Sequence, residues 1–483
     1  MSRGKKLISD VFLFAISNFG SKVLVFLLVP LYTHTLSTEE YGIADLITVT
    51  NHLLFPLLTV GITEATLRFS LDEDTPKEKV VSLSLLTVFT SVIILLLLSP
   101  LVGLIKPGIK DYLAFFILIY LSSSLNNCFS NFTRGLDKTR IFAIKGILYT
   151  ILLLSSNILF LIIFKWGING YLISMIIADS LSVLYMIIAA KEYKYISFSF
   201  DLSVLKKMFK YSSPMIPTIL AWWIMQVSDK YIIIAFSGIA ISGIYSVAYK
   251  IPSILSLITT IFNQAWQISA VKTVDDSDYK QYFKKVYSFY FTISLIFSSI
   301  LILLSEILGK LLFANDYFIA WRYVPLLIIA YFYSGLSGVM ASAFTAIKKT
   351  LVLLYSTIVG AAFNVAFNFI LIPYFGAMAA ATTTMVGFLI TFIIRDFCLN
   401  RICEIKLHTI KDYLIFVLVL GESIISIYDM EVKYLICGCI CITLLVLYSA
   451  TLREILKDIK ALFLSKRKKM ITQKCANNNS NLE

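Results

Sequence analysis

The sequence predicts an all-α integral membrane protein. Three observations carry this prediction: a high apolar content, apolar runs long enough to cross a bilayer, and an uneven distribution of basic residues between the links. Of the 483 residues, 58% are hydrophobic and 15% are charged, whereas soluble domains average about 45–50% and about 25%. A soluble core cannot absorb so much apolar surface. The net charge of +13 then reflects basic cytoplasmic links, and no nucleic-acid partner is expected.

Apolar runs predict about fourteen transmembrane helices, since a spanning helix needs roughly 20 apolar residues. The segments are 11–33, 41–62, 82–105, 112–132, 141–164, 168–190, 212–235, 243–262, 286–308, 321–346, 351–372, 376–394, 412–428 and 434–451. A β-barrel would need alternating polar and apolar residues, and runs such as VIILLLLS (92–99) do not alternate. The first segment is too long and too directly followed by a second span to be a cleaved signal peptide.

The basic residues orient these spans. Most of the 42 Lys and Arg residues fall in the amino terminus and in alternate links, which are 64–81, 133–140, 191–211, 263–285, 347–350, 395–411 and the tail after 452. The opposite links hold five: Lys106, Lys110, Lys165, Lys310 and Lys433. Because cytoplasmic links are enriched in Lys and Arg, we predict a multi-pass inner-membrane topology with both termini in the cytoplasm.

Three weak internal similarities recur at one offset of about 200–212 residues, which is the pattern of an internal repeat. The pairs are FTRGLDKT (132–139) with FTAIKKT (344–350), WGINGYLISMI (166–176) with FGAMAAATTTM (375–385), and EYGIADLITV (40–49) with SGIYSVAYKI (242–251). The offset corresponds to six spans, so the two halves keep the same orientation and are related by a pseudo-two-fold axis along the membrane normal.

This repeat predicts four parts of the chain: a six-helix lobe (1–200), a second six-helix lobe (201–400), an additional helix pair (401–452) and a basic cytoplasmic tail (453–483). Secondary transporters use two such lobes for alternating access, with the substrate near the bilayer midplane. The sequence lacks a P-loop, an H-E-x-x-H motif and a paired Cys-x-x-Cys motif. We therefore predict a transporter and not an enzyme, with no cofactor and no metal site.

Three lysines are expected to lie inside the membrane and to form a cationic, substrate-binding cavity. Lys22 falls in the middle of the first span, close to Asn18, and Lys230 shares a helix face with Gln226. Lys250 lies well inside the eighth span. An ionisable group at a helix centre costs about 2.5–3.5 kcal/mol on insertion scales, so each lysine is a functional candidate, and Lys suits phosphate. The alternative is structural pairing with buried acids, or anchoring near the headgroups.

Other polar residues in the spans support this cavity. Asp45, Asp179 and Asp229 are candidates for ion coupling or for counter-ions to the lysines, and His52 titrates near neutral pH or serves as a hydrogen-bonded structural residue. Arg322 is a candidate outer gate, or else an anchor in an aromatic belt. Pro252, directly after the Lys250 turn, predicts a bend in the eighth span.

Four stretches of the chain resemble the Wzx-type polysaccharide flippases of the multidrug/oligosaccharidyl-lipid/polysaccharide exporter superfamily. They are LVFLLVPLYTHTLSTEEYGIADLITV (24–49), GITEATLRF (61–69), FTRGLDKTRIFAI (132–144) and SDKYIIIAFSGIAISGIYSVAYKIPS (228–253). The resemblance implies a flippase for O-antigen or capsule repeat units linked to undecaprenyl diphosphate. It implies transport from the cytoplasmic to the periplasmic leaflet, driven by a proton or sodium gradient.

The resemblance also implies a cationic cavity, and Lys22, Lys230 and Lys250 match that pattern by position. The expected partners are the lipid-linked oligosaccharide, the coupling ion, membrane lipids and other polysaccharide assembly proteins. Two alternatives stay open: a multidrug or toxin exporter of the same superfamily, for which an acidic cavity would be expected, and a flippase for the lipid-linked peptidoglycan precursor.

Overall fold

Long helices form wherever the sequence offers an apolar run. The computed structural model describes residues 26–457 apart from 27, 73, 106–109, 198–199, 274–275, 348, 429 and 455–456. One set of helices, here called the N-terminal lobe, comprises α2 (Val29–Thr35), α3 (Thr38–Leu58), α4 (Ile62–Ser70), α5 (Lys77–Ile105), α7 (Leu113–Gly135), α8 (Thr139–Asn157) with its π-helical extension η1 (Ile158–Ile163), α9 (Gly167–Ala189), the short η2 (Glu192–Lys194) and α10 (Leu202–Ser212).

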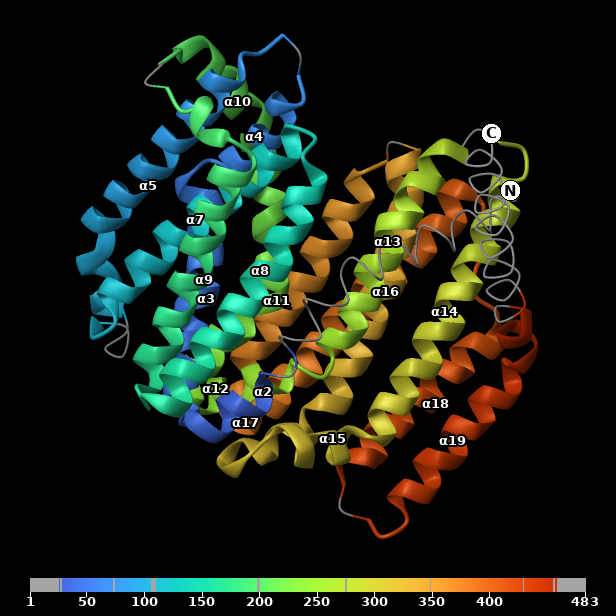
Figure 1. The fold of residues 1–483 in the computed structure, drawn as a ribbon. Coiled ribbons are helices and arrows are strands. Elements are labelled where there is room, and N and C mark those ends of the chain that lie inside the picture. Colours follow the sequence, from blue (N-terminus) through green and yellow to red (C-terminus); the bar gives the residue numbers. More distant parts are fainter. Residues whose placement is uncertain are drawn as a thin grey trace, which may run out of the picture.

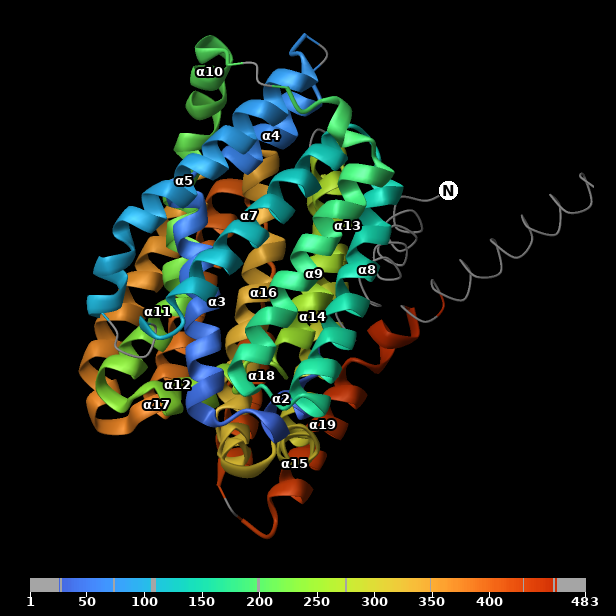
Figure 2. The same cartoon turned by 60° about the vertical axis from the view of Figure 1, so that its left-hand side comes forward.

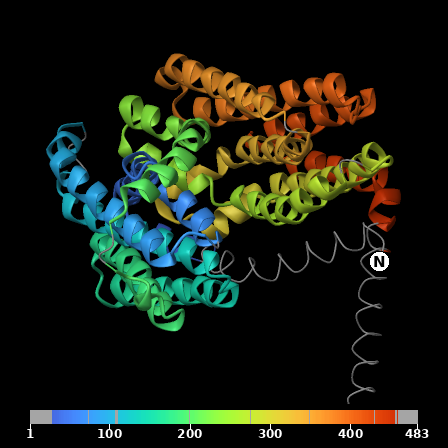
Figure 3. The ribbon, with the colours of Figure 1, turned by 90° about the horizontal axis from the view of Figure 1, so that it is seen from above.

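A second set, here called the C-terminal lobe, lies beside the first (Figure 1). It comprises η3 (Ser213–Met215), α11 (Ile216–Ser237), α12 (Ile239–Ala248), α13 (Ser253–Thr273), α14 (Tyr279–Leu303), α15 (Ser305–Leu312), η4 (Asn315–Arg322), α16 (Val324–Ala346) and α17 (Leu351–Cys403). The last two helices, α18 (Ile410–Ile427) and α19 (Lys433–Leu447), pack on α14. Figure 3 shows them at the far side of the C-terminal lobe from the N-terminal lobe.

The fold class predicted from the sequence is confirmed. The described residues are helical with no β-strand. Within them, nine helices are long and apolar enough to cross a membrane, or ten if the bent pair α12–α13 is one span. The first predicted span lies mostly outside the described residues, and the total of fourteen stays a prediction.

Local sequence signals explain where several helices begin and bend. Ser37 and Glu40 form a capping box at the start of α3, each side chain accepting a hydrogen bond from the other residue's backbone N–H. The helices α12 and α13 meet at an angle of 51°, at the break where Pro252 predicts a bend. The 53-residue α17 bends at Gly376, whose φ of 56° and ψ of −141° are not helical, so it contains both predicted spans 351–372 and 376–394.

One predicted helix end differs in the structure. The sequence ends the twelfth span at residue 394 and places Arg395 in a link, 395–411, whereas α17 continues to Cys403 and Arg395 is 2% exposed. The helix continues because residues 395–403 contain neither Gly nor Pro, and Arg395 donates to the Ser337 carbonyl oxygen of α16.

The two lobes meet where α3 packs against α12 and α11. Two glycines permit this close approach. A Cβ atom at Gly42 would lie 2.4 Å from the Ile239 carbonyl oxygen, and one at Gly243 would lie 2.0 Å from the Thr38 carbonyl oxygen. This contact lies toward the end of the molecule that carries α15, whereas α4 and α10 mark the opposite end (Figure 2).

Candidate functional site

An ion pair joins the two lobes. The Lys230 Nζ of α11 lies 2.7 Å from Asp45 Oδ2 of α3, and the Ser246 hydroxyl of α12 donates to the same carboxylate oxygen over 2.8 Å. The side chains of Lys230 and Asp45 are 11% and 17% exposed. The Asp45 carboxylate is therefore the counter-ion of Lys230 in this conformation.

The neighbouring Asp229 lies in a dense hydrogen-bond network. Tyr245 and Tyr249 donate their hydroxyls to its Oδ2 over 2.8 Å and 2.7 Å, and the backbone N–H of Lys230 donates to its Oδ1 over 2.8 Å. Thr384 of α17 approaches the same Oδ2 at 3.3 Å. Because these donors surround the carboxylate, Asp229 is held rigidly between α11, α12 and α17.

Lys250 lies in the break between α12 and α13, directly after Tyr249. Among the described residues, this junction therefore holds two lysines, Lys230 and Lys250, and two aspartates, Asp45 and Asp229. The cationic cavity expected at these lysines stays a prediction. The third lysine, Lys22, and its neighbour Asn18 lie outside the described residues.

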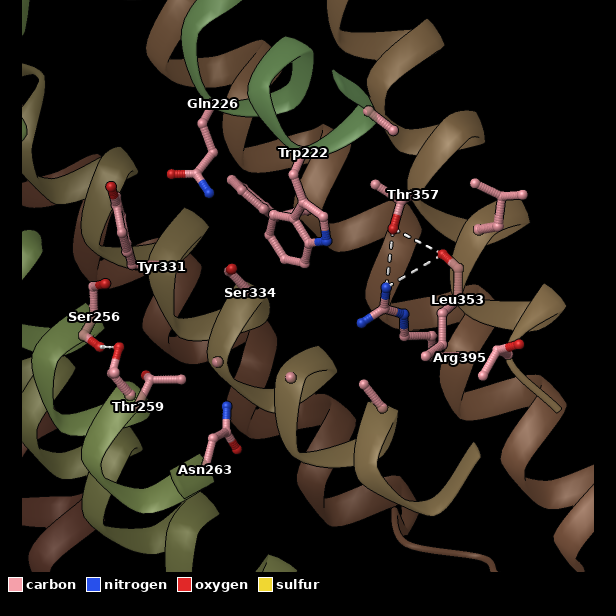
Figure 4. Close-up of a pocket in the computed structure, with 18 of the residues that line it drawn as sticks. Trp222, Gln226, Ser256, Thr259, Asn263, Tyr331, Ser334, Leu353, Thr357 and Arg395 are labelled. Carbon is pink, nitrogen blue, oxygen red and sulfur yellow. Dashed lines mark hydrogen bonds between the residues drawn. The ribbon is translucent and has the colours of Figure 1, made fainter. Parts of the chain in front are cut away.

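A pocket of about 570 Å³ opens within the C-terminal lobe. Trp222 and Gln226 of α11 line it, as do hydroxyl and amide groups of α13 and α16, among them Thr259, Asn263 and Ser334. Figure 4 shows the Trp222 indole between Gln226 on one side and Arg395 on the other, with Asn263 across the pocket. The volume falls within the range of about 300–1,000 Å³ that is usual for small-molecule sites.

Arg395 supplies the positive charge of this pocket. Its guanidinium donates to the Ser337 carbonyl oxygen (2.9 Å), to Ser356 Oγ (2.9 Å) and to Thr357 Oγ1 (3.0 Å). All of these acceptors are neutral. The adjacent acid, Asp396, bonds instead to His408 and Tyr413.

A second pocket, of about 190 Å³, lies within the N-terminal lobe. It is lined by Asp179, His52 and Lys145, among other residues. Asp179 is buried and accepts a hydrogen bond from the Asn126 amide. The structure thus brings two of the predicted site residues, Asp179 and His52, to one cavity, apart from Asp45 and Asp229.

Arg322, the candidate gate residue, lies at the end of η4 with its guanidinium carbon 5.8 Å from the centre of the Trp321 ring. Gln226 lines the C-terminal pocket as described above. Arg395 was missed as a site residue because the sequence placed it in a link. The signal that could have found it is the absence of Gly and Pro from residues 388–403, which predicts a helix that continues past Arg395.

The chain is similar to a known protein family and to several solved structures. A model of the family described as polysaccharide biosynthesis protein matches residues 7–267. No curated protein matches the chain. Among solved structures, the lipid II flippase MurJ in an inward closed conformation superposes with a TM-score of 0.71 at 17% identity, covering 92% of this chain and 99% of that one.

A multidrug resistance MATE family transporter of the MOP superfamily, in an inward-facing conformation, superposes with a TM-score of 0.63 at 14% identity, over 81% of this chain and 95% of that one. A MOP superfamily transporter from Pyrococcus furiosus gives 0.56 at 15% identity, over 83% and 96%. At these identities the likeness shows a shared fold. Because the family model covers more than half of the sequence, the chain belongs to the polysaccharide biosynthesis protein family.

Proposed function

We propose that the protein is a flippase that moves oligosaccharide repeat units, linked to undecaprenyl diphosphate, from the cytoplasmic to the periplasmic leaflet by alternating access. The observation that carries the proposal is the pocket of the C-terminal lobe. It places the hydroxyls of Ser256, Thr259 and Thr260, the amides of Gln226 and Asn263, and an indole face inside an apolar helical protein. Hydroxyl, amide and aromatic groups suit a glycan, which offers hydroxyls that exchange hydrogen bonds and an apolar ring face that stacks on an indole.

The contact between α3 and α12 supports the alternating-access part of the proposal. The lobes touch through glycine packing, and through the Lys230–Asp45 pair. An ion pair and a helix contact can both separate without unfolding either lobe. In the proposed cycle these contacts close the periplasmic side while the glycan enters from the cytoplasm, and they separate when the lobes rock apart.

Ion coupling rests on Asp179 and Asp229 in this proposal. Each carboxylate is buried among hydrogen-bond donors, Asp179 in the N-terminal lobe and Asp229 in the C-terminal lobe. A carboxylate at bilayer depth binds a proton or sodium favourably because either cation neutralises its charge. Asp45 takes the role of counter-ion to Lys230.

Reconstitution tests the proposal. The protein in liposomes, supplied with a fluorescent short-chain polyprenyl-diphosphate oligosaccharide, should expose the inner-leaflet pool to an external glycosidase faster than protein-free liposomes do. Trp222→Ala should slow that exposure by about tenfold, because an aromatic stacking face is lost. Ile147→Ala, at an exposed position on α8, is the matched control and should transport normally.

Two further substrates separate the alternatives. The fold likeness to the lipid II flippase favours a peptidoglycan-precursor substrate as the second candidate, so lipid II is assayed in parallel. Efflux of a cationic dye tests the multidrug exporter. Transport of lipid II or of the dye, with no transport of polyprenyl-linked repeat units, would replace the proposed function with the corresponding alternative.

A further inference from the structure

Arg395 is a fully buried cation that lacks an acidic partner among the residues that the structure describes. It is 2% exposed, and its acceptors are the hydroxyls of Ser356 and Thr357 and the carbonyl oxygens of Ser337 and Leu353. These dipoles hold the guanidinium in place but leave its net charge uncompensated. Buried charges in proteins are ordinarily paired or bound to an ion of opposite sign.

The buried guanidinium belongs to the wall of a pocket. Arg395 lines the 570 Å³ cavity together with Thr357 and Leu353, and Figure 4 shows the guanidinium at the edge of that space. An anion that occupies the pocket would therefore lie beside Arg395.

A second group in the same pocket also lacks a partner. The Asn263 Oδ1 atom is buried and accepts no hydrogen bond from the described residues. Gly338 of α16 lies directly beside this amide, since a Cβ atom at Gly338 would lie 2.9 Å from Asn263 Nδ2. A buried acceptor without a partner, in a pocket whose wall also carries a cation, matches a ligand that has both a hydroxyl and a negative charge.

Among the described residues, the junction of Lys230, Lys250, Asp45 and Asp229 has no such excess of positive charge. There, Lys230 is paired with Asp45, and Asp229 lies next to Lys230 in the chain. A diphosphate or carboxylate entering that junction would compete with two existing carboxylates. At Arg395 it would meet a cation whose described partners are all neutral.

We propose that the C-terminal pocket is an anion subsite in which Arg395 binds a phosphate or carboxylate group of the substrate and Asn263 accepts a hydrogen bond from a neighbouring hydroxyl. The inference rests on the proposed flippase function and adds to it the residue that recognises the charged part of the lipid-linked glycan. Two sources share this chemistry, the diphosphate of the lipid carrier and an acidic sugar of the repeat unit.

The test is equilibrium binding to the purified full-length protein in detergent, with three probes: farnesyl diphosphate, a lipid-free disaccharide containing glucuronic acid, and a neutral disaccharide of the same size. Arg395→Gln removes the charge and keeps planar donors. Ser334→Asp places a carboxylate on the pocket wall without touching the hydrogen bonds of Arg395, and Ser334→Asn is its neutral control of equal size.

We expect the wild-type protein to bind at least one anionic probe. Arg395→Gln and Ser334→Asp should each weaken the binding of that probe by about tenfold or more, because the charge-assisted contact is lost in the first variant and opposed in the second. Ser334→Asn adds the same bulk without the charge and should therefore lose several-fold less affinity than Ser334→Asp, and the neutral disaccharide should not distinguish Ser334→Asp from Ser334→Asn. If only the affinity for farnesyl diphosphate is lost, the subsite binds the diphosphate of the lipid carrier. If only the affinity for the glucuronic acid disaccharide is lost, the subsite binds an acidic sugar of the repeat unit.

Should Arg395→Gln fail to fold, the Ser334 pair still decides the question. Equal affinity of Ser334→Asp and Ser334→Asn for the anionic probes would overturn the inference, and so would unchanged binding by a folded Arg395→Gln protein. Failure of the proposed function is distinguishable, because it appears as absent lipid transport by the wild-type protein while the binding experiment still reports on the anion subsite.

Discussion

Asp45 and Lys230 behave as one unit at the boundary between the lobes. Their side chains are nearly buried, and their charged atoms lie 2.7 Å apart. Removing one partner of a buried pair strands the other charge, which costs about 3–5 kcal/mol, whereas replacing both with apolar residues is often close to neutral. This asymmetry makes the pair suitable for a double-mutant cycle.

We expect Lys230→Met and Asp45→Leu each to lower the free energy of unfolding in detergent by about 3–5 kcal/mol. The double variant should lose much less than the sum of the two single losses. Reversible denaturation of the four proteins measures this coupling. Additive losses would mean that the two groups do not interact in solution.

Glu192 gives the protein a stability that depends on pH. It lies in η2, beyond the end of the α9 span, and its Oε1 accepts a hydrogen bond from Thr133 Oγ1 over 2.5 Å. Burial raises the pKa of Glu192 to about 7, while Thr133 and Lys138 oppose the rise. The folded state therefore keeps a proton between about pH 4.5 and 7 that the unfolded state has already released.

Because the folded state binds more protons in that window, the free energy of unfolding falls as pH rises from about 4.5 to 7. The total fall is about 3 kcal/mol at most, and the stability levels off above that window. Glu192→Gln should remove this slope and be more stable than wild type at pH 8. Thermal unfolding at pH 5, 6, 7 and 8 measures it. Glu431→Gln, at an exposed position, should keep the wild-type slope, and an unaltered slope in Glu192→Gln would contradict the assignment.

At the scale of elements, the α3–α12 contact depends on glycine. A Cβ at Gly243 would overlap the backbone of α3, which cannot move aside as a flexible side chain can. Gly243→Ala should therefore push the two helices apart and disfavour the conformation in which the lobes touch. Nothing lies within 4 Å of the Cβ position at Gly146 in α8, so Gly146→Ala is the matched control.

The distance between spin labels at His34 and Asp316, two exposed positions on α2 and η4, reports the separation of the lobes. We expect Gly243→Ala to shift the distribution to longer distances and to slow transport by about tenfold or more, since packing geometry at such contacts is tightly constrained. Gly146→Ala should match wild type. A distribution unchanged by Gly243→Ala would show that α3 and α12 are not in close contact in solution.

At the scale of the whole molecule, an ion cluster attaches the helix pair α18–α19 to the C-terminal lobe. Glu306 of α15 bonds to Lys310 on its own helix, and to Lys433 and Tyr434 at the start of α19. Burial alone would raise the pKa of Glu306, but these three donors outweigh it and lower the pKa to about 2. The attachment therefore persists above the ordinary carboxyl pKa and is lost only as pH falls toward about 2.

We expect Glu306→Gln to weaken this attachment, so that backbone amides of α19 exchange with deuterium several-fold faster at pH 7. Lys310→Gln removes a partner that does not reach α19 and should leave the α19 exchange unchanged. Hydrogen–deuterium exchange with mass spectrometry measures both variants. Equal exchange in wild type and Glu306→Gln would mean that apolar packing on α14 alone holds α19.

The amino-acid sequence was sufficient to predict the fold class and the course of most helices. Run length, apolar composition and breaks such as Pro252 are local properties, and a helix satisfies its own backbone hydrogen bonds within one segment. The same local information also identified Asp45, Asp229 and Lys230 as charges that need an explanation, because burying any of them is costly.

Which of these charges face one another could not be read from the chain, because pairing is a property of packed surfaces. Asp45 and Lys230 are 185 positions apart, and no periodicity within one helix links them. Arg395 shows the same limit: its charge suggested a solvated link, and packing between α16 and the two halves of α17 buried it beside a pocket. Local sequence sets where helices run, whereas long-range packing sets which polar groups are neutralised and which stay available to a ligand.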